Sequence, residues 1–372
     1  MFDWLGLKIV NLATMFKVLF CLFLFSAYSF GQTVVPFVDF NNYFRSFQDD
    51  NFRQIEFQEI KEFKAGDELV AYIDTRGNLR VFDGKERMDI TPMTVNYEVS
   101  DHLLAYNIGP TLNCWDEGKL STLTYFARNY KVRDSLIVYE DTRFNSVNVY
   151  WNKQIIQLYQ VTGDLYMPVA VGDNMVAFKD NGDFYKIFWN GKIYDLGVWN
   201  GTIDFKIGAD VLCYNDPTTR TFAIFDKGTF LDVEQVYMNK YKAGRGFIVY
   251  EDLNGNLMYC KNGKTEQLSN FSASFWEVKD DLVIWGENSF VYAYTNDQKI
   301  QVTNYKPADY TLKNNVFAFR NILGGVSALV NGKIFEVTNQ TNSEYEIYGD
   351  ILLVKLFNRS YIVLKNGKIF QT

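Results

Sequence analysis

The chain reads MVAFKDNGDFYKIFWNGK at residues 175–192, and similar stretches follow at 247–264 (FIVYEDLNGNLMYCKNGK) and 316–333 (VFAFRNILGGVSALVNGK). Each has a short apolar run that ends in an aromatic residue, then a polar turn, a second apolar run and Asn-Gly-Lys. The aromatic residue and the turn glycine are 13 residues apart in all three stretches. A constant offset in separate stretches indicates one structural unit that is repeated.

The aromatic position of this unit can be followed along most of the chain. Its occupants are Tyr72, Tyr106, Tyr139, Phe178, Tyr214, Tyr250, Trp285 and Phe319, with Val354 in the last copy. The steps between them are 33 to 39 residues. One step of 35 residues back from Tyr72 reaches Phe37, in VPFVDF, and gives a tenth, partial copy. Near-constant periods of about 20–50 residues are typical of solenoids, propellers and arrays.

Each copy is predicted to contain four short β-strands. Around Phe178 these are MPVAVG, MVAFKD, DFYKIFW and IYDLGV, separated by short turns. The Asn190-Gly191 pair is a strong hairpin signal, because type I′ turns need a positive φ at both central residues. Related pairs recur at Asp83-Gly84, Glu117-Gly118, Lys227-Gly228, Asn262-Gly263, Asn331-Gly332 and Asn366-Gly367. Helical periodicity is absent after residue 31, so the expected class is all-β.

Four antiparallel strands in a period of about 35 residues predict a single β-propeller of four-stranded antiparallel blades, with about eight to ten copies. The segments AYIDTRGNLRVF at 71–82 and VYEDLNGNLMYC at 249–260 resemble the WD40-like repeats of TolB-type propellers. That resemblance implies blades arranged radially around a channel. We expect the propeller over 58–372, with 32–57 as a partial first repeat or as closure strands that pair with the C-terminal copy. A β-solenoid is the weaker alternative, because its rungs seldom carry Asn-Gly hairpins.

The N-terminus has the features of a secretory signal peptide. Residues 15–32 contain a start-like Met15, the positive Lys17 and an apolar run, and small residues precede Gln32. We therefore predict a signal peptide over 1–31, with Met15 as an alternative start. The protein is expected to be exported to the periplasm or the extracellular space, and not to be an integral membrane protein after cleavage. The alternative is a membrane anchor retained from the same apolar run.

Composition argues against several functions. The formal net charge is −7 and no positive cluster is visible, so we expect no nucleic-acid partner. The chain has one histidine, His102, expected in a solvated turn, and lacks Gly-x-Ser-x-Gly and phosphate-binding glycine motifs. We therefore predict no catalytic activity, no cofactor and no metal. Cys114, Cys213 and Cys260 lie in apolar runs and are expected to be buried rather than bridged.

Acidic residues recur two positions after the aromatic residue of the repeat. They are Asp39, Asp74, Asp141, Asp180, Asp216, Asp252 and Glu287. Radial packing would place these carboxylates in a ring at one rim. We interpret each as a cap of its own turn, because they recur along the repeat instead of concentrating in one copy. The alternatives are a site for a cation, a basic peptide or a sugar, or a carboxylate pair for glycoside cleavage.

The longest step, 39 residues, separates Tyr139 from Phe178, and its extra length lies in QLYQVTGDLYMP at 157–168. Loops on rigid scaffolds often carry function, although neutral drift in loop length is the alternative. The candidate binding residues are Tyr159, Asp164 and Tyr166, with Glu140 and Arg143 from the segment before them.

The function predicted from these features is non-catalytic. We expect a monomeric scaffold that binds a protein or a cell-envelope component. One alternative is a carboxylate-dependent carbohydrate-active enzyme on the propeller face. The other is a structural protein of an envelope assembly.

Overall fold

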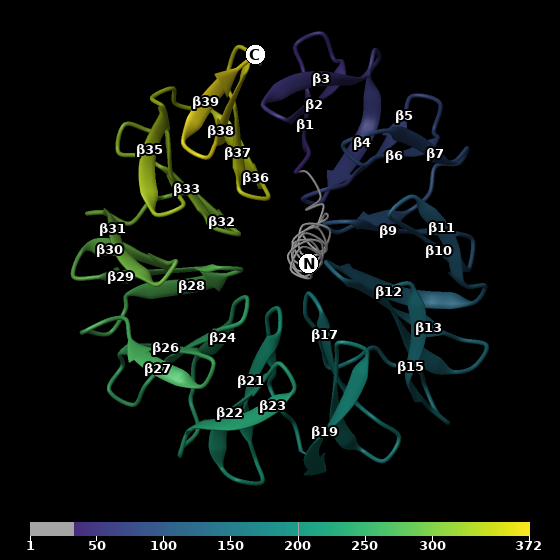
Figure 1. The fold of residues 1–372 in the computed structure, drawn as a ribbon, viewed down its shortest axis with the longest axis vertical. Helices are drawn as coiled ribbons and strands as arrows, with labels where there is room; N and C mark the ends of the chain where they lie inside the picture. The colour runs from purple at the N-terminus through teal and green to yellow at the C-terminus, as the bar shows by residue number, and fades with distance from the viewer. Residues whose placement is uncertain (1–32, 200) are drawn as a thin grey trace, which may run out of the picture. The chain divides into compact units, whose positions relative to one another are not determined.

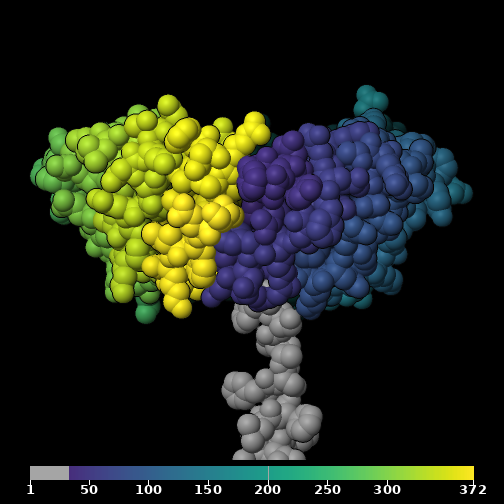
Figure 2. Space-filling view, turned by 90° about the horizontal axis from the view of Figure 1, so that it is seen from above, coloured from purple at the N-terminus to yellow at the C-terminus, as the bar shows by residue number. Residues whose placement is uncertain are grey.

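The computed structural model describes residues 33–199 and 201–372. These residues form 39 β-strands in ten antiparallel sheets, which are arranged radially as the blades of a ring (Figure 1). The last blade (yellow) lies against the first (purple), as Figure 2 shows. The described part of the chain contains no helix long and apolar enough to cross a membrane. The signal-peptide prediction for 1–31 falls outside the described residues.

Nine blades have four strands each, and the first strand of each lies on the inside of the ring (Figure 1). Blades 2 to 5 contain β4 (Ile60–Ala65), β5 (Val70–Asp74), β6 (Leu79–Phe82) and β7 (Arg87–Thr91); β8 (Tyr97–Val99), β9 (Leu103–Ile108), β10 (Thr111–Asp116) and β11 (Lys119–Thr124); β12 (Ala127–Arg133), β13 (Leu136–Asp141), β14 (Ser146–Trp151) and β15 (Gln154–Gln160); and β16 (Ala170–Val171), β17 (Met175–Lys179), β18 (Phe184–Trp189) and β19 (Lys192–Trp199).

Blades 6 to 10 repeat this order. They contain β20 (Lys206–Ile207), β21 (Val211–Asp216), β22 (Thr221–Asp226) and β23 (Thr229–Glu234); β24 (Tyr241–Ala243), β25 (Ile248–Glu251), β26 (Leu257–Lys261) and β27 (Lys264–Gln267); β28 (Phe275–Lys279), β29 (Leu282–Glu287), β30 (Phe290–Thr295) and β31 (Gln298–Thr303); β32 (Tyr310–Lys313), β33 (Val316–Arg320), β34 (Val326–Val330) and β35 (Lys333–Thr338); and β36 (Glu344–Tyr348), β37 (Ile351–Lys355), β38 (Tyr361–Lys365) and β39 (Lys368–Gln371).

Blade 1 has three strands, β1 (Val35–Val38), β2 (Phe44–Gln48) and β3 (Asn51–Glu56). These strands hydrogen-bond to one another, so the expectation that this segment would pair with strands of the C-terminal copy is wrong. They form a blade of their own and pack face to face on blade 10, where the rings of Phe37 and Tyr361 are 4.5 Å apart. Face-to-face packing buries the apolar sides of both sheets without a shared strand.

The aromatic position of the repeat lies on the second strand of each four-stranded blade and on β1 of blade 1. All ten occupants are buried between blades. Phe178, for example, is fully buried and stacks on Tyr159 of the preceding blade, with ring centroids 5.4 Å apart. The cores therefore lie between neighbouring sheets. Cys114, Cys213 and Cys260 are buried within them and are free thiols.

The hairpin turns between third and fourth strands follow the Asn-Gly prediction. Asn190 and Gly191 have φ values of 48° and 73°, and the three other Asn-Gly pairs are similar. Residue 191 must also be glycine for steric reasons, because a Cβ atom there would lie 2.6 Å from the ring of Trp151. The Asp83-Gly84 pair differs, since only Gly84 has a positive φ there.

Candidate functional site

The antiparallel blades give the ring two faces. The turns between first and second strands and between third and fourth strands lie on one side, here called face A. The turns between second and third strands, together with the connections from one blade to the next, lie on the other side, here called face B. Candidate sites differ in chemistry between the two faces.

The repeated acids lie on face B. The six aspartates cap their own turns, which confirms that interpretation for them, whereas it is wrong for Glu287. Oδ1 of Asp74 accepts hydrogen bonds from the backbone N–H groups of Arg76 and Asn78, each at 2.9 Å. Burial alone would raise the pKa of Asp74, but hydrogen bonds from Asn78 and the charge of Arg80 outweigh it and lower the pKa. The same two-bond cap is made by Asp39, Asp180 and Asp252. Asp141 and Asp216 also make two bonds, to the second and third residues after them.

Glu287, the seventh acid of this set, is used differently. Its Oε1 accepts the backbone N–H groups of Asn270 and Phe271, which belong to the connection before its own blade. The longer side chain therefore fixes an inter-blade connection, whereas the aspartates fix the turn that follows them. In both cases local hydrogen bonds occupy the carboxylate.

Two of the predicted binding residues are buried supports. Glu140 is 1% exposed and accepts hydrogen bonds from Arg128 Nε at 2.8 Å and from Asn129 Nδ2 at 2.6 Å. Tyr159 is also buried, and its hydroxyl donates to the backbone carbonyl of Tyr166 at 2.5 Å. The Tyr159 ring lies between the rings of Tyr166 and Phe178, at centroid distances of 5.2 and 5.4 Å. These contacts hold the inserted segment rigidly on blades 4 and 5.

The other predicted residues, Arg143, Asp164 and Tyr166, are exposed on face B. The guanidinium of Arg143 lies over the rings of Phe126 and Phe144, at 5.6 and 5.3 Å from their centroids. Hydrogen bonds join this turn to the inserted segment, since Asn145 Nδ2 donates to the carbonyls of Val161 and Gly163. We call the exposed set Tyr125, Phe126, Arg143, Phe144 and Tyr166 the aromatic patch.

Exposed large apolar side chains are concentrated on face B. Of 25 in the described residues, 15 lie in the turns and connections of face B and three lie at strand ends on that face. The other seven lie within the first three residues of fourth strands, next to the turns of face A, and those turns themselves carry none. The face B set is Phe40, Phe57, Met93, Ile108, Tyr125, Phe126, Phe144, Tyr166, Val169, Phe184, Trp199, Val236, Tyr237, Leu253, Phe271, Ile322, Leu323 and Phe357. Sequence reasoning missed this set, because the two kinds of loop that carry it share a side only in the folded ring.

Face A carries an acidic rim on the inner turns. Asp67, Asp101, Asp134, Asp173 and Asp280 each stand five residues before the aromatic position of the repeat. This position was not predicted from the sequence, although the recurrence of aspartate at a fixed offset from the aromatic position is visible when the copies are aligned. His102 also lies in one of these turns, half-buried.

Electrostatic repulsion acts within this rim. Burial, followed by the charges of Asp101, Asp173, Asp280 and Asp67, raises the pKa of Asp134 to about 7. Positive groups offset part of the acidic charge, since Lys313 pairs with Asp67 and Lys279 with Asp280. Among residues 33–199 and 201–372, no three His, Cys, Asp or Glu side chains converge as ligands for a metal ion.

The ten radial sheets define a β-propeller. The chain belongs to the 10-bladed beta propeller domain family, whose model matches residues 28–370. The all-β propeller predicted from the repeats is therefore confirmed, with ten blades. The assignment to TolB-type repeats stays a prediction.

Several solved structures are similar to this chain at low sequence identity. The computationally designed Ika8 protein is 11% identical, with 90% of this chain and 99% of that chain covered and a TM-score of 0.37. The CRINKLY WD40 ectodomain of the Arabidopsis thaliana receptor kinase ACR4 is 9% identical, with 74% and 96% covered and a TM-score of 0.31. PorZ of Porphyromonas gingivalis, a surface component of the type-IX secretion system, is 8% identical, with 92% and 59% covered and a TM-score of 0.27. A comparison with curated proteins gave no match.

Proposed function

We propose that this ten-bladed propeller is an exported, non-catalytic scaffold that docks a protein partner on face B. The observation that carries the proposal is the distribution of exposed apolar side chains in the loops, of which 15 lie in the turns and connections of face B and none in the turns of face A. Single exposed apolar residues are ordinary, but their gathering on one side is typical of an interaction surface. The compartment in the proposal follows from the signal-like segment at residues 15–32.

The aromatic patch has the chemistry of an interface centre. Tyrosine, tryptophan and arginine dominate the residues that contribute most to binding energy at protein interfaces. Here Arg143 bridges Phe126 and Phe144, and Tyr166 rests on the buried ring of Tyr159. Such a preformed surface loses little conformational entropy on binding. The partner we expect presents an apolar surface with a carboxylate that reaches Arg143.

The carbohydrate-active alternative has less support. It needs two carboxylates free to act as acid and base. The repeated aspartates are occupied by their own turns, and Glu287 is occupied by the connection before it. No specific observation in the described residues favours catalysis over binding.

A pull-down from the envelope fraction of the native cell tests the proposal. The variant Phe126→Ser/Phe144→Ser removes the two rings that Arg143 covers. The matched control, Ile334→Ser/Ile369→Ser, removes two exposed apolar side chains from the fourth strands β35 and β39. We expect the same protein to be recovered by the wild type and the control, and reduced at least roughly tenfold by the patch variant. Equal recovery by all three proteins would refute docking at the patch.

A further inference from the structure

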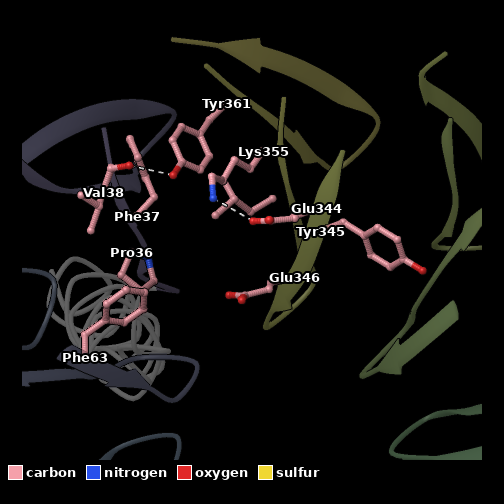
Figure 3. Close-up of a pocket in the computed structure, with 10 residues that line it drawn as sticks. Pro36, Phe37, Val38, Phe63, Glu344, Tyr345, Glu346, Lys355 and Tyr361 are labelled. Atoms are coloured by element: carbon pink, nitrogen blue, oxygen red, sulfur yellow. Dashed lines mark hydrogen bonds and ion pairs between the residues drawn. The ribbon is translucent and has the colours of Figure 1, made fainter. Parts of the chain in front are cut away.

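Among the described residues, no strand occupies the inner position of blade 1. In the nine other blades an inner strand pairs with the second strand, whereas β1 pairs only with β2. At this place a cavity of about 230 Å³ lies between blade 1 and blade 10 (Figure 3). Sites for drug-sized ligands are larger, about 300–1,000 Å³, so this one suits a single long side chain.

The two walls of this groove differ in chemistry. Pro36 of β1 and Phe63 of β4 supply apolar surface on one side, and the ring of Tyr361, from β38 of blade 10, packs on Phe37 (Figure 3). Glu344 and Glu346, both on β36, direct their carboxylates into the gap from the other side (Figure 3). A ligand in the groove therefore meets apolar contacts and negative charge together.

The negative charge is only partly neutralised by the residues that line the groove. Lys355 Nζ pairs with Glu344 Oε2 at 2.8 Å. Glu346 accepts a hydrogen bond from the hydroxyl of Tyr348, which carries no charge. Two carboxylates thus face one ammonium group. Such a groove complements a side chain with an aliphatic stem and a positive end, because the stem packs on apolar surface while the charge reaches the carboxylates.

The free edge of β1 limits how such a ligand is held. The N–H of Asp39 donates to the carbonyl of Tyr43, so the backbone groups of Phe37 face β2 and those of Pro36 and Val38 face inward. Pro36 has no N–H, and the Val38 carbonyl already accepts the Tyr361 hydroxyl at 2.7 Å. A full strand ladder on this edge is therefore disfavoured, and side-chain recognition has to supply the specificity.

We propose that the groove binds an extended segment of a partner protein and takes up a lysine or arginine side chain of that segment. The aliphatic stem packs on Phe63 and Pro36, and the cation reaches Glu344 and Glu346. Residues 26–31 of this chain (SAYSFG) contain no basic side chain, so they do not supply the complementary charge. The groove is on blades 1, 2 and 10, apart from the aromatic patch on blades 3 to 5, so it does not depend on the function proposed above.

A pair of peptides of equal length and opposite charge tests this inference on the full chain. The probe is a fluorescein-labelled hexapeptide of alternating valine and lysine, followed by fluorescence anisotropy, and its partner has glutamate in place of lysine. We expect only the lysine peptide to bind. Glu344→Gln/Glu346→Gln should weaken its binding at least roughly tenfold, because charge-assisted contacts are lost. The control Glu336→Gln, an exposed carboxylate on the outer strand β35, should bind like the wild type.

The position of the bound peptide distinguishes binding in the groove from binding at the acidic rim of face A. A photo-crosslinking version of the lysine peptide should label 35–38, 60–65 or 344–348, and Asp134→Asn should leave its affinity unchanged. Labelling confined to the turns of face A would overturn the proposal. So would an absence of binding, equal affinity for the glutamate peptide, or tighter binding of a peptide with the sequence of residues 26–31.

Discussion

Asp67 accepts a hydrogen bond from the side-chain amide of Asn314, with Oδ2 and Nδ2 2.9 Å apart, although 247 positions separate the two residues. Asp67 lies in the inner turn of blade 2 and Asn314 in that of blade 9. The same carboxylate also accepts the backbone N–H of Gly349, in blade 10, and pairs with Lys313. One aspartate therefore joins both sides of the ring closure, across the blade that lacks a described inner strand.

Loss of this carboxylate should weaken the closure. We expect Asp67→Ala to cost about 3–5 kcal/mol, because Lys313 and Asn314 would lose a shared, largely buried partner. Asp67→Asn should cost less, since the amide oxygen still accepts hydrogen bonds while the charge is lost. Chemical denaturation followed by circular dichroism measures both. As a control, Glu117→Ala removes an exposed pair with Lys153 and should cost no more than about 1 kcal/mol. Similar values for Asp67→Ala and Glu117→Ala would contradict the closing role.

The acidic rim predicts a pH dependence centred on Asp134. Its pKa is raised to about 7 by burial and by the surrounding carboxylates, so the folded chain binds this proton more tightly than the unfolded chain does. The stabilisation from protonation is complete below the ordinary value of 3.8 and is lost as the pH rises through about 7. The melting temperature should therefore fall between about pH 4 and about pH 7, and Asp134→Asn should reduce that fall. An unchanged fall in the variant would show that Asp134 does not titrate in this range.

The aromatic position of the repeat should be a main source of stability. Phe178→Ala leaves a cavity between blades 4 and 5 and is expected to cost about 3–5 kcal/mol. Phe184→Ala, at an exposed aromatic on the same blade, should change stability by less than about 1 kcal/mol. Thermal melts of the two variants provide the comparison, and equal shifts would contradict burial of the Phe178 ring.

Features that depend on local sequence were the predictable ones. The positive φ values at Asn190 and Gly191 follow from turn chemistry, and the burial of Phe178 follows from its constant offset to that turn. The aspartate caps were predictable for the same reason, because they bond within four residues. Each of these features recurs in several copies of the repeat, so the same prediction could be checked in one copy against the others.

Features that depend on neighbouring blades were not predictable. Glu140 and Tyr159 were expected at the surface, but Glu140 is covered by Arg128 of the adjacent strand β12, and the Tyr159 hydroxyl bonds the carbonyl of Tyr166 in the connection after β15. The aromatic patch joins Phe126 and Phe144 from separate loops, and a sequence pattern does not show that these loops meet. The carboxylates of β36 likewise meet Phe63 only because the ring closes between the chain ends.

If the aspartates are turn caps, they need a side-chain oxygen at that position but not its negative charge. Asp252 Oδ1 accepts the N–H groups of Asn254 at 2.9 Å and Asn256 at 2.8 Å, and an asparagine at this position keeps an oxygen there. Asp252→Asn should therefore preserve the fold at little cost, whereas Asp252→Ala should cost about 1 kcal/mol, the net value of a lost hydrogen bond. A cation site predicts instead that Asp252→Asn fails almost as badly as Asp252→Ala, because such a site needs the charge of the carboxylate. Melting curves with and without calcium separate the two, and we expect no calcium effect on the wild type or on either variant. A rise in melting temperature with calcium that disappears in Asp252→Asn would show that Asp252 is a metal ligand and not a turn cap.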